Sequence, residues 1–431
     1  MRYFIVKMIV RLKNKKERFF HLLILFFVYG FVKSIVYFAP LFLNNTLSNV
    51  HEFGRFEYSL NLGQTLSTVI ALGLPYAYAY FVFKEKEADL DVIFHNIYLG
   101  IVVILVALGF LFPDIFESLS FNAVLIGVAL SNQLFIATYY KLKGRNLLAI
   151  IIDCGIYIVL LIFTFLIFRK YVEYKLSLWS YCILGYTILM VVRFHLHNIG
   201  KFKSIQKYDW IRVLKYGFLI VITLFLTSLL TTSTRIYIEY FIDFNSVGIY
   251  SLFIRVASAI IIFHRVVVII LYRKIYGDKH ANLDDYFATL IILALGAGFL
   301  LYITIPALAP YIIPTFSNAY LHSGNLFFWT ILQAVCWTSV ALLELIIYRE
   351  NILYKYIPLL LSILVAMLLA LFVYHHFLGI SGSEIVKINV LAVLLIALCQ
   401  ILLIKSHSFY YRKTLRAHII LTLVCLFALF F

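Results

Sequence analysis

The sequence predicts an all-α polytopic membrane protein, in which twelve transmembrane helices form two six-helix bundles around a central cavity. The composition is one reason, because 64% of the 431 residues are hydrophobic and 13% are charged, against roughly 25% charged residues in soluble domains. The mean hydropathy of +0.99 is another. A soluble chain must cover its surface with polar side chains, so these values exclude a soluble globular protein.

Twelve apolar runs along the chain have about the 20 residues that a helix needs to cross a bilayer. They cover residues 19–43, 58–83, 93–112, 119–139, 147–168, 176–193, 213–233, 247–272, 287–309, 324–348, 356–374 and 383–404. A further apolar segment, 418–431, has fourteen residues. As a helix it reaches about 21 Å, less than the ~30 Å hydrocarbon core, so we expect it to dock as a short half-span.

The charges are distributed unevenly along the chain. The 36 Lys and Arg residues exceed the 20 Asp and Glu residues and give a formal net charge of +16. With the N-terminus in the cytoplasm, the cytoplasmic segments hold 27 basic residues when Arg193 and Lys215 at the adjoining span ends are included, the outer loops hold 5 and the rest of the spans hold 4. Basic residues accumulate in cytoplasmic loops, so the count predicts a cytoplasmic N-terminus. No basic face is larger than a loop, which excludes nucleic acid as a partner.

These patterns divide the chain into five predicted segments. Residues 1–18 form a basic amphipathic segment that we expect to lie along the inner membrane surface. The N-terminal six-helix lobe covers 19–197, a cytoplasmic linker covers 198–212, and the C-terminal six-helix lobe covers 213–404. Residues 405–431 form a basic tail and the short apolar half-span.

The sequence contains no pattern typical of an enzyme site or a cofactor. The five cysteines lie inside apolar runs, with no CxxC pair and no histidine at metal-ligand spacing. No outer loop much exceeds fifteen residues, and no extramembrane domain is predicted. We therefore expect no catalytic residues, no metal and no cofactor, and we expect the protein to work within the membrane.

The two predicted lobes begin alike. Tyr29-Gly30-Phe31 in the first span matches Tyr216-Gly217-Phe218 in the seventh, and Phe53 to Phe56 before the second span matches Val247 to Tyr250 at the eighth. Chance similarity in an aromatic-rich chain remains an alternative for matches this short. Because six is even, true repeats would be related by an axis along the membrane normal. Transporters built in this way bind the substrate between the halves.

Several motifs together resemble a known family. They are Glu52 to Ser59 followed by Gly73-Leu74-Pro75, then Tyr139 to Arg145, Ser246 to Ser251, and Pro306 to Pro314. In this order they resemble Wzx-type polysaccharide flippases of the MOP superfamily, which also contains the MATE exporters. One departure is that the eighth span ends in Leu271-Tyr272-Arg273-Lys274 and lacks a counterpart of Gly73-Leu74-Pro75.

The resemblance implies a multi-pass protein of the bacterial inner membrane. It implies a flippase that moves an undecaprenyl-pyrophosphate-linked oligosaccharide, an O-antigen or other surface polysaccharide repeat unit, by alternating access. The expected partners are this lipid-linked oligosaccharide, membrane lipids, and the polysaccharide polymerase with its chain-length machinery. The alternatives are a MATE-like drug or cation antiporter and a membrane polysaccharide polymerase or ligase; the latter usually carries a large outer loop, which this chain lacks.

A diphosphate needs cations along its path, because an isolated anion is very unfavourable in a low-dielectric medium. The basic residues inside spans that we predict to line the cavity are Lys33, Arg255 and Arg265. Each is costly at mid-membrane, and the alternatives are snorkelling or pairing with an acid. Arg235 and Lys387 lie at predicted outer helix ends, where snorkelling is expected.

Other polar residues inside spans complete the predicted site. Those that could face the sugar are Gln64, Thr68, Asn132, Gln133, Thr227 and Gln333. Hydrogen bonding between packed helices is an equally good explanation of these side chains. His264 and Glu344 are candidates for proton coupling, since histidine titrates near neutral pH; an interior hydrogen-bonded histidine is the alternative.

Overall fold

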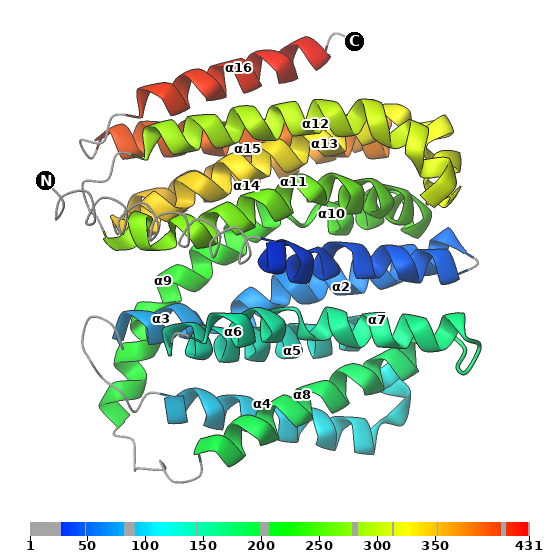
Figure 1. Ribbon diagram of the computed structural model, residues 1–431, viewed down its shortest axis with the longest axis vertical. Helices are drawn as coiled ribbons and strands as arrows, with labels where there is room; N and C mark the ends of the chain where they lie inside the picture. Colours follow the sequence, from blue (N-terminus) through cyan, green and yellow to red (C-terminus); the bar gives the residue numbers. More distant parts are fainter. Residues whose placement is uncertain are drawn as a thin grey trace, which may run out of the picture.

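The computed structural model describes residues 27–47, 49–81, 91–143, 145–198, 207–277, 283–312, 314–350, 352–406 and 411–429 (Figure 1). The predicted segment 1–18 lies outside these residues. The described part is helical and contains no strand. Its helices are Phe27–Thr46, here called helix 27–46, α2 (Val50–Ile70), α3 (Leu74–Tyr80), α4 (Asp91–Leu111), η2 (Pro113–Glu117), α5 (Leu119–Leu142), α6 (Asn146–Asp153), α7 (Gly155–Phe168), α8 (Leu176–Asn198), α9 (Lys207–Thr231), α10 (Thr234–Phe241), α11 (Phe244–Gly277), α12 (Asp284–Ile312), α13 (Pro314–Arg349), α14 (Leu353–Phe377), α15 (Gly382–Ser406) and α16 (Arg412–Leu429).

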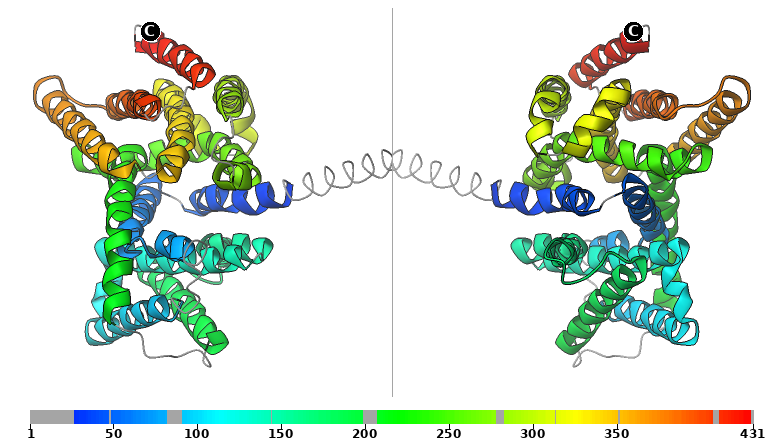
Figure 2. Two further views of the ribbon diagram at one scale, coloured as in Figure 1. Left: turned by 90° about the vertical axis from the view of Figure 1, so that its left-hand side faces the viewer. Right: turned by 90° about the vertical axis from the view of Figure 1, so that its right-hand side faces the viewer.

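Most helices lie side by side with their axes roughly aligned, so the molecule has two ends (Figure 1). We call the end at which α8 stops and α9 starts the linker end, and the opposite end the distal end. Helices α4 to α8 occupy the lower part of Figure 1 and α11 to α16 the upper part. Helix α9 crosses between the two parts, as the end views in Figure 2 show.

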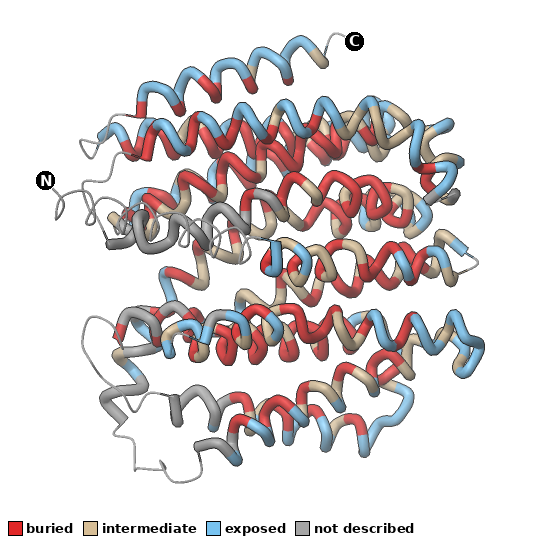
Figure 3. The backbone as a smooth tube through the Cα atoms, in the orientation of Figure 1, coloured by how far each residue is buried: buried red, intermediate tan, exposed pale blue. Residues whose placement is uncertain are grey.

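The prediction of an all-helical polytopic membrane protein is confirmed. Eight described helices are long and apolar enough to cross a membrane, and two bent pairs, α6 with α7 and α9 with α10, bring the number to ten. Large apolar side chains lie exposed on the outside of the molecule, Phe110 and Tyr311 among the most exposed, while buried residues face the interior (Figure 3). This distribution suits a protein surrounded by lipid.

Two further predicted spans correspond to α2 and α4. The apolar part of α4 is short, Tyr98–Leu111. Helix α2 carries a polar stripe that includes Glu57, Asn61 and Thr65, all buried. This stripe is tolerated because α2 packs between α5 and α11 and meets protein on these sides.

A tight turn separates α2 from α3 near the linker end. Leu72 and Gly73 both have positive φ, 51° and 66°, and Pro75 lies in the first turn of α3. A Cβ added to Gly73 would lie 2.4 Å from the carbonyl oxygen of Gly217 on α9. Glycine is therefore required at residue 73 for the backbone conformation and for the close approach of α9.

At the distal end, the second pair of repeat motifs meets directly. A Cβ on Gly54 of α2 would lie 1.9 Å from the Phe244 carbonyl oxygen, and a Cβ on Gly248 of α11 would lie 2.5 Å from that of Val50. The two helices therefore touch backbone to backbone at related glycines. The first pair of motifs has unlike surroundings, since Gly217 lies against Gly73 whereas a Cβ added to Gly30 would meet no atom of the described residues within 4 Å.

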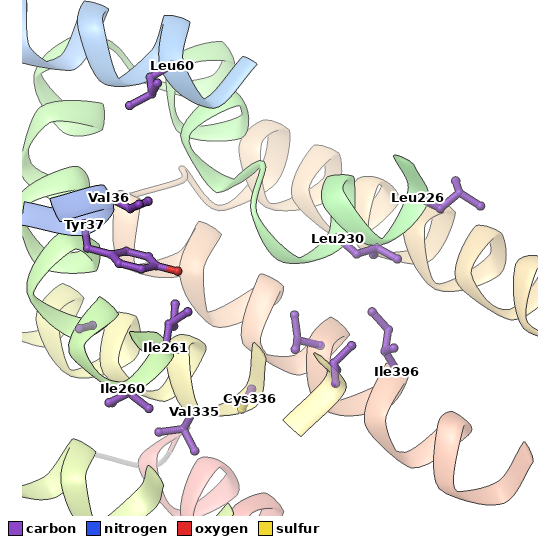
Figure 4. Packing of buried hydrophobic residues seen from close by; sticks show 14 of the residues in the cluster. Val36, Tyr37, Leu60, Leu226, Leu230, Ile260, Ile261, Val335, Cys336 and Ile396 are labelled. Atoms are coloured by element: carbon purple, nitrogen blue, oxygen red, sulfur yellow. The ribbon is translucent and has the colours of Figure 1, made fainter. Parts of the chain in front are cut away.

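Buried apolar residues of both halves form one cluster between the helices (Figure 4). Val36, Tyr37 and Leu60 come from the first half of the chain, and Leu230, Ile261 and Val335 come from the second half. The two halves therefore share apolar packing as well as the glycine contact.

Two predicted boundaries differ from the helices observed. The linker is shorter than 198–212, because α8 extends to Asn198 and α9 begins at Lys207. Helix α16 begins at Arg412, six residues before the predicted apolar segment 418–431. Its first turn is polar and is fixed by Asp284 of α12, whose carboxylate accepts hydrogen bonds from the backbone N–H groups of Lys413 at 2.9 Å and Thr414 at 2.7 Å.

We expect the linker end to face the cytoplasm. Reporter fusions that end after Arg145 or Lys207 should then score as cytoplasmic, and a fusion after Asn318, near the distal start of α13, should score as external. The physical reason is the excess of basic residues in the segments assigned to the inside. Paired alkaline phosphatase and green fluorescent protein fusions make the measurement, and an external score at Lys207 would contradict the orientation.

Candidate functional site

A cavity of about 340 Å³ lies between the two halves of the chain. Helix 27–46, α2, α5, α6 and α7 line it from the first half, and α9, α10, α11 and α13 line it from the second. Its polar and aromatic lining residues are Lys33, Tyr37, Gln64, Ser67, Gln133, Asp153, Tyr157, Ser228, Thr231, Thr232, Arg235, Tyr250, Arg255, Ser258, Gln333 and Trp337. Both halves therefore contribute charged and amide side chains to one space.

Two arginines of the second half bind one carboxylate of the first half. Glu57 on α2 is fully buried, with 0% of its surface exposed. Its Oε1 accepts from Nε of Arg255 and its Oε2 from Nη2 of Arg255, both at 2.9 Å. Nε of Arg235 lies 3.1 Å from Oε2 of the same carboxylate. This group of three, the distal triad, ties α2 to α10 and α11.

The arginines of the distal triad keep N–H groups that the described residues do not use. Arg255 also donates from Nη1 to the Val36 carbonyl at 3.2 Å, which leaves two of its five N–H groups. Nε of Arg235 also contacts Ser251 Oγ at 2.7 Å, and the described part of the chain offers no hydrogen-bond acceptor to its terminal nitrogens. Both arginines line the cavity, whereas Glu57 is not among the described lining residues.

The third cation in the cavity is paired differently. Nζ of Lys33 bonds to the carboxylate of Asp153, and both residues line the cavity. Asp153 ends α6, where the chain bends by 56° into α7. Gln133 holds this bend, because its Nε2 donates to the Asp153 carbonyl at 2.8 Å and its Oε1 accepts from the Ile156 N–H at 2.9 Å.

The five basic residues considered in the sequence have different surroundings. Lys33 and Arg255 line the cavity, and each is also paired with an acid, the alternative that the sequence left open. The side chain of Arg265 lies outside the described residues. The expectation that Arg235 snorkels is wrong: it is 7% exposed and bound to Glu57. Lys387 is half-buried and pairs with Glu384 in the first turn of α15.

Glu57 is the site residue that the sequence analysis missed. The predicted second span begins at Tyr58, where the apolar run begins, and so excludes Glu57, whereas α2 begins at Val50. Glu57, Asn61 and Thr65 recur every four residues, the spacing of one helix face. That polar stripe, together with the capping side chain of Asn49, which accepts from the His51 N–H, could have shown that the helix starts earlier.

Three of the six polar residues predicted to face a sugar line the cavity, namely Gln64, Gln133 and Gln333. Gln64 donates to the Tyr157 hydroxyl at 2.6 Å, and Gln333 accepts from the Tyr250 hydroxyl at 2.7 Å. Thr68, Asn132 and Thr227 are not among the lining residues. The three glutamines therefore line the space while also joining helices.

The pair predicted for proton coupling lies outside the cavity lining. The His264 ring packs edge-on against Trp337, with 5.7 Å between ring centroids. Glu344 on α13 accepts a hydrogen bond from Thr227 on α9 at 2.9 Å. Proton coupling by His264 and Glu344 stays a prediction.

The charges around the cavity can receive an anion. Lys33, Arg235 and Arg255 face two carboxylates, Asp153 and Glu57, so the described group carries one excess positive charge. We assign the excess to the two arginines of the distal triad, which share one carboxylate, whereas Lys33 is paired with Asp153. Guanidinium N–H groups in a low-dielectric space bind carboxylate or phosphate oxygens strongly.

Comparison with known structures identifies the fold. A crystal structure of a MATE protein in complex with MaL6 matches with a TM-score of 0.57 at 12% identity, over 88% of this chain and 94% of that chain. An outward-facing multidrug resistance MATE family transporter of the MOP superfamily matches with a TM-score of 0.48 at 13% identity, over 88% of this chain and 93% of that one. No family model and no curated protein matches the sequence. The predicted MATE-like fold is confirmed.

We expect Glu57→Ala to destabilise the protein strongly. It leaves two buried guanidinium groups without a counter-ion, and breaking a buried ion pair in this way costs roughly 3–5 kcal/mol. The melting temperature of the purified protein, measured by intrinsic fluorescence, should fall by several degrees.

The matched control is Glu52→Ala on the same helix, since Glu52 and Arg55 form a pair that is more than a third exposed. Exposed pairs contribute about 0–1 kcal/mol, so this variant should melt close to the wild type. The double variant Glu57→Gln/Arg235→Gln should recover part of the loss, because one buried cation is removed with the carboxylate. Equal melting temperatures for Glu57→Ala and Glu52→Ala would contradict the role assigned to the distal triad.

Proposed function

We propose that the protein is a transporter that moves a diphosphate-linked, lipid-anchored oligosaccharide across the membrane. The observation that carries this proposal is the excess positive charge in a cavity shared by the two halves of a MATE-like fold. Arg235 and Arg255 are 7% and 5% exposed and line the cavity. Cations at such depth are costly and call for a functional reason.

Each part of such a substrate has a matching surface. The diphosphate would bind the remaining N–H groups of Arg235 and Arg255, the geometry in which arginine holds phosphate oxygens. The amides of Gln64, Gln133 and Gln333 offer donors and acceptors to sugar hydroxyls. Tyrosines and Trp337 offer flat apolar faces to sugar rings. The lipid tail can remain in the bilayer.

The size of the cavity limits what it holds in this conformation. A volume of about 340 Å³ lies near the lower end of the range for small-ligand sites, roughly 300–1,000 Å³. We infer that this conformation accommodates the diphosphate and the first sugar, and that a longer oligosaccharide requires the halves to separate further.

Such a separation at the distal end must break specific contacts between the halves. They are the backbone contact at Gly54 and Gly248, the distal triad, and a hydrogen bond of 2.7 Å from Asn44 of helix 27–46 to Thr315 of α13. A bound phosphate can replace Glu57 as the counter-ion of the arginines. Substrate binding would thereby lower the cost of opening the distal end, as alternating access requires.

The second candidate is a drug or cation antiporter, which the MATE-like fold favours. A cationic substrate would meet an excess of positive charge in the cavity, and Asp153, the one carboxylate among its described lining residues, is already bound by Lys33. This charge balance makes the anionic substrate the better proposal.

The proposed substrate also determines the membrane and the partner proteins that we expect. Lipid-linked oligosaccharides of this kind imply the bacterial inner membrane, with the linker end and the N-terminus in the cytoplasm. A polysaccharide polymerase and its chain-length machinery would use the product. Genes for glycosyltransferases and a polymerase beside the gene for this chain would support the assignment.

We expect Arg235→Gln and Arg255→Gln to lower translocation by at least about tenfold per folded molecule, because each removes charge-assisted hydrogen bonds to the diphosphate. Translocation of a fluorescent prenyl-diphosphate oligosaccharide is measured in proteoliposomes by its accessibility to dithionite. Arg235→Lys should retain part of the activity, since charge remains while bidentate binding is lost. Lys33→Ala should have a smaller effect, because Lys33 is neutralised by Asp153.

Arg169→Gln is the control for this prediction, since Arg169 lies at the distal end of α7, away from the cavity. Full translocation by well-folded Arg235→Gln and Arg255→Gln proteins would contradict the assignment of these arginines to the anion site. Gradient-driven transport of ethidium, without translocation of the lipid-linked oligosaccharide, would favour the antiporter.

Cross-linking the distal end should stop transport. The rings of His51 on α2 and Phe244 on α11 are in edge contact, with 5.6 Å between centroids, so cysteines introduced at both positions can be joined by a short bifunctional thiol reagent. Because the halves could then no longer separate there, translocation should fall to background and return on reduction. Unchanged translocation by the cross-linked protein would rule out opening at this contact.

A further inference from the structure

We propose that Pro40 is a positioning residue for Arg255: it leaves the Val36 carbonyl without a donor in its own helix, and that carbonyl fixes the guanidinium at the cavity. The effect on substrate rests on the proposed function. The contact between the two helices does not depend on it.

The helical hydrogen-bond pattern explains why this carbonyl is available. In an α-helix the carbonyl of a residue accepts from the N–H four positions later, which for Val36 is Pro40. Proline has no N–H, and its ring pushes the preceding-turn carbonyl away from the helix axis. Helix 27–46 nevertheless continues through Pro40, and Val36 is 8% exposed. A buried carbonyl inside a membrane requires a donor from elsewhere.

Arg255 of α11 supplies that donor. Its Nη1 donates to the Val36 carbonyl at 3.2 Å, while Nε and Nη2 bind Glu57 of α2, both at 2.9 Å. Acceptors on two different helices thus bind all three nitrogens of the planar guanidinium group, which fixes its orientation. The two N–H groups that remain are thereby set in direction, on a residue that lines the cavity. Without the Val36 contact, the guanidinium is held on the Glu57 side alone.

Pro358 provides a matched control. It also lies inside a helix, α14, and there removes the donor for the Tyr354 carbonyl. Pro358 and Tyr354 are exposed, and neither lines the cavity. A general effect of replacing proline in a membrane helix should therefore appear equally in Pro358→Ala.

The first test is a double-mutant cycle on the melting temperature of the full chain in detergent, with Pro40→Ala, Arg255→Lys and the pair. In Pro40→Ala the new N–H occupies the Val36 carbonyl, so Arg255→Lys should lower the melting temperature less than it does in the wild type, by roughly 2 °C. The Pro358→Ala background should leave the effect of Arg255→Lys unchanged. If the melting-temperature changes of Pro40→Ala and Arg255→Lys simply add in the double variant, the inference is overturned, whatever the protein transports.

The second test measures binding of farnesyl diphosphate by calorimetry, with farnesol as the probe that lacks the anion. Pro40→Ala should weaken diphosphate binding 3- to 10-fold without lowering the melting temperature, and should add less than twofold in the Arg255→Lys background. Wild-type affinity in Pro40→Ala would overturn the positioning role and leave the proposed function standing. A wild-type protein that binds farnesyl diphosphate no better than farnesol would instead count against the proposed function, and the melting cycle would still decide on the contact.

Discussion

One carboxylate buried between two guanidinium groups is the constraint on which the arrangement of the two halves depends. None of these charges is stable alone in a low-dielectric interior, so α2, α10 and α11 must stay together wherever the distal triad forms. The glycines at 54 and 248 make this possible, because any side chain there would hold α2 and α11 apart. The polar stripe of α2 follows from the same contact, since that face meets protein and not lipid.

The order of the charges from the protein interior to the cavity explains how the site can be both stable and receptive. Glu57 is fully buried, is not among the described lining residues and supplies the counter-charge of the two arginines, which both line the cavity. Lys33 and Asp153 form a separate neutral pair toward the linker end. An incoming anion therefore meets positive charge on one side of the cavity, which gives the proposed substrate a defined orientation.

The sequence was sufficient for the fold class, because apolar runs long enough to cross a bilayer indicate helices that are surrounded by lipid. It also identified Lys33 and Arg255, since deep basic residues are rare enough to be noticed. It missed Glu57 and misjudged Arg235, because hydropathy sets helix ends where apolar residues stop, and α2 begins with a segment that contains several polar residues, of which Glu57 is buried. The partners of Lys33 and Arg255 are 120 and 198 residues away along the chain, and no local pattern encodes such pairing.

The low apolarity of α2 also has a consequence for how the chain enters the membrane during synthesis. Helix α2 emerges from the ribosome long before α10 and α11, so Glu57 reaches the translocon with neither arginine yet made. Until both arginines are made, the Glu57 carboxylate lacks the counter-ions that it has in the folded protein, and an unpaired charge at that depth opposes insertion. The distal triad can therefore form only after the C-terminal half has been synthesised.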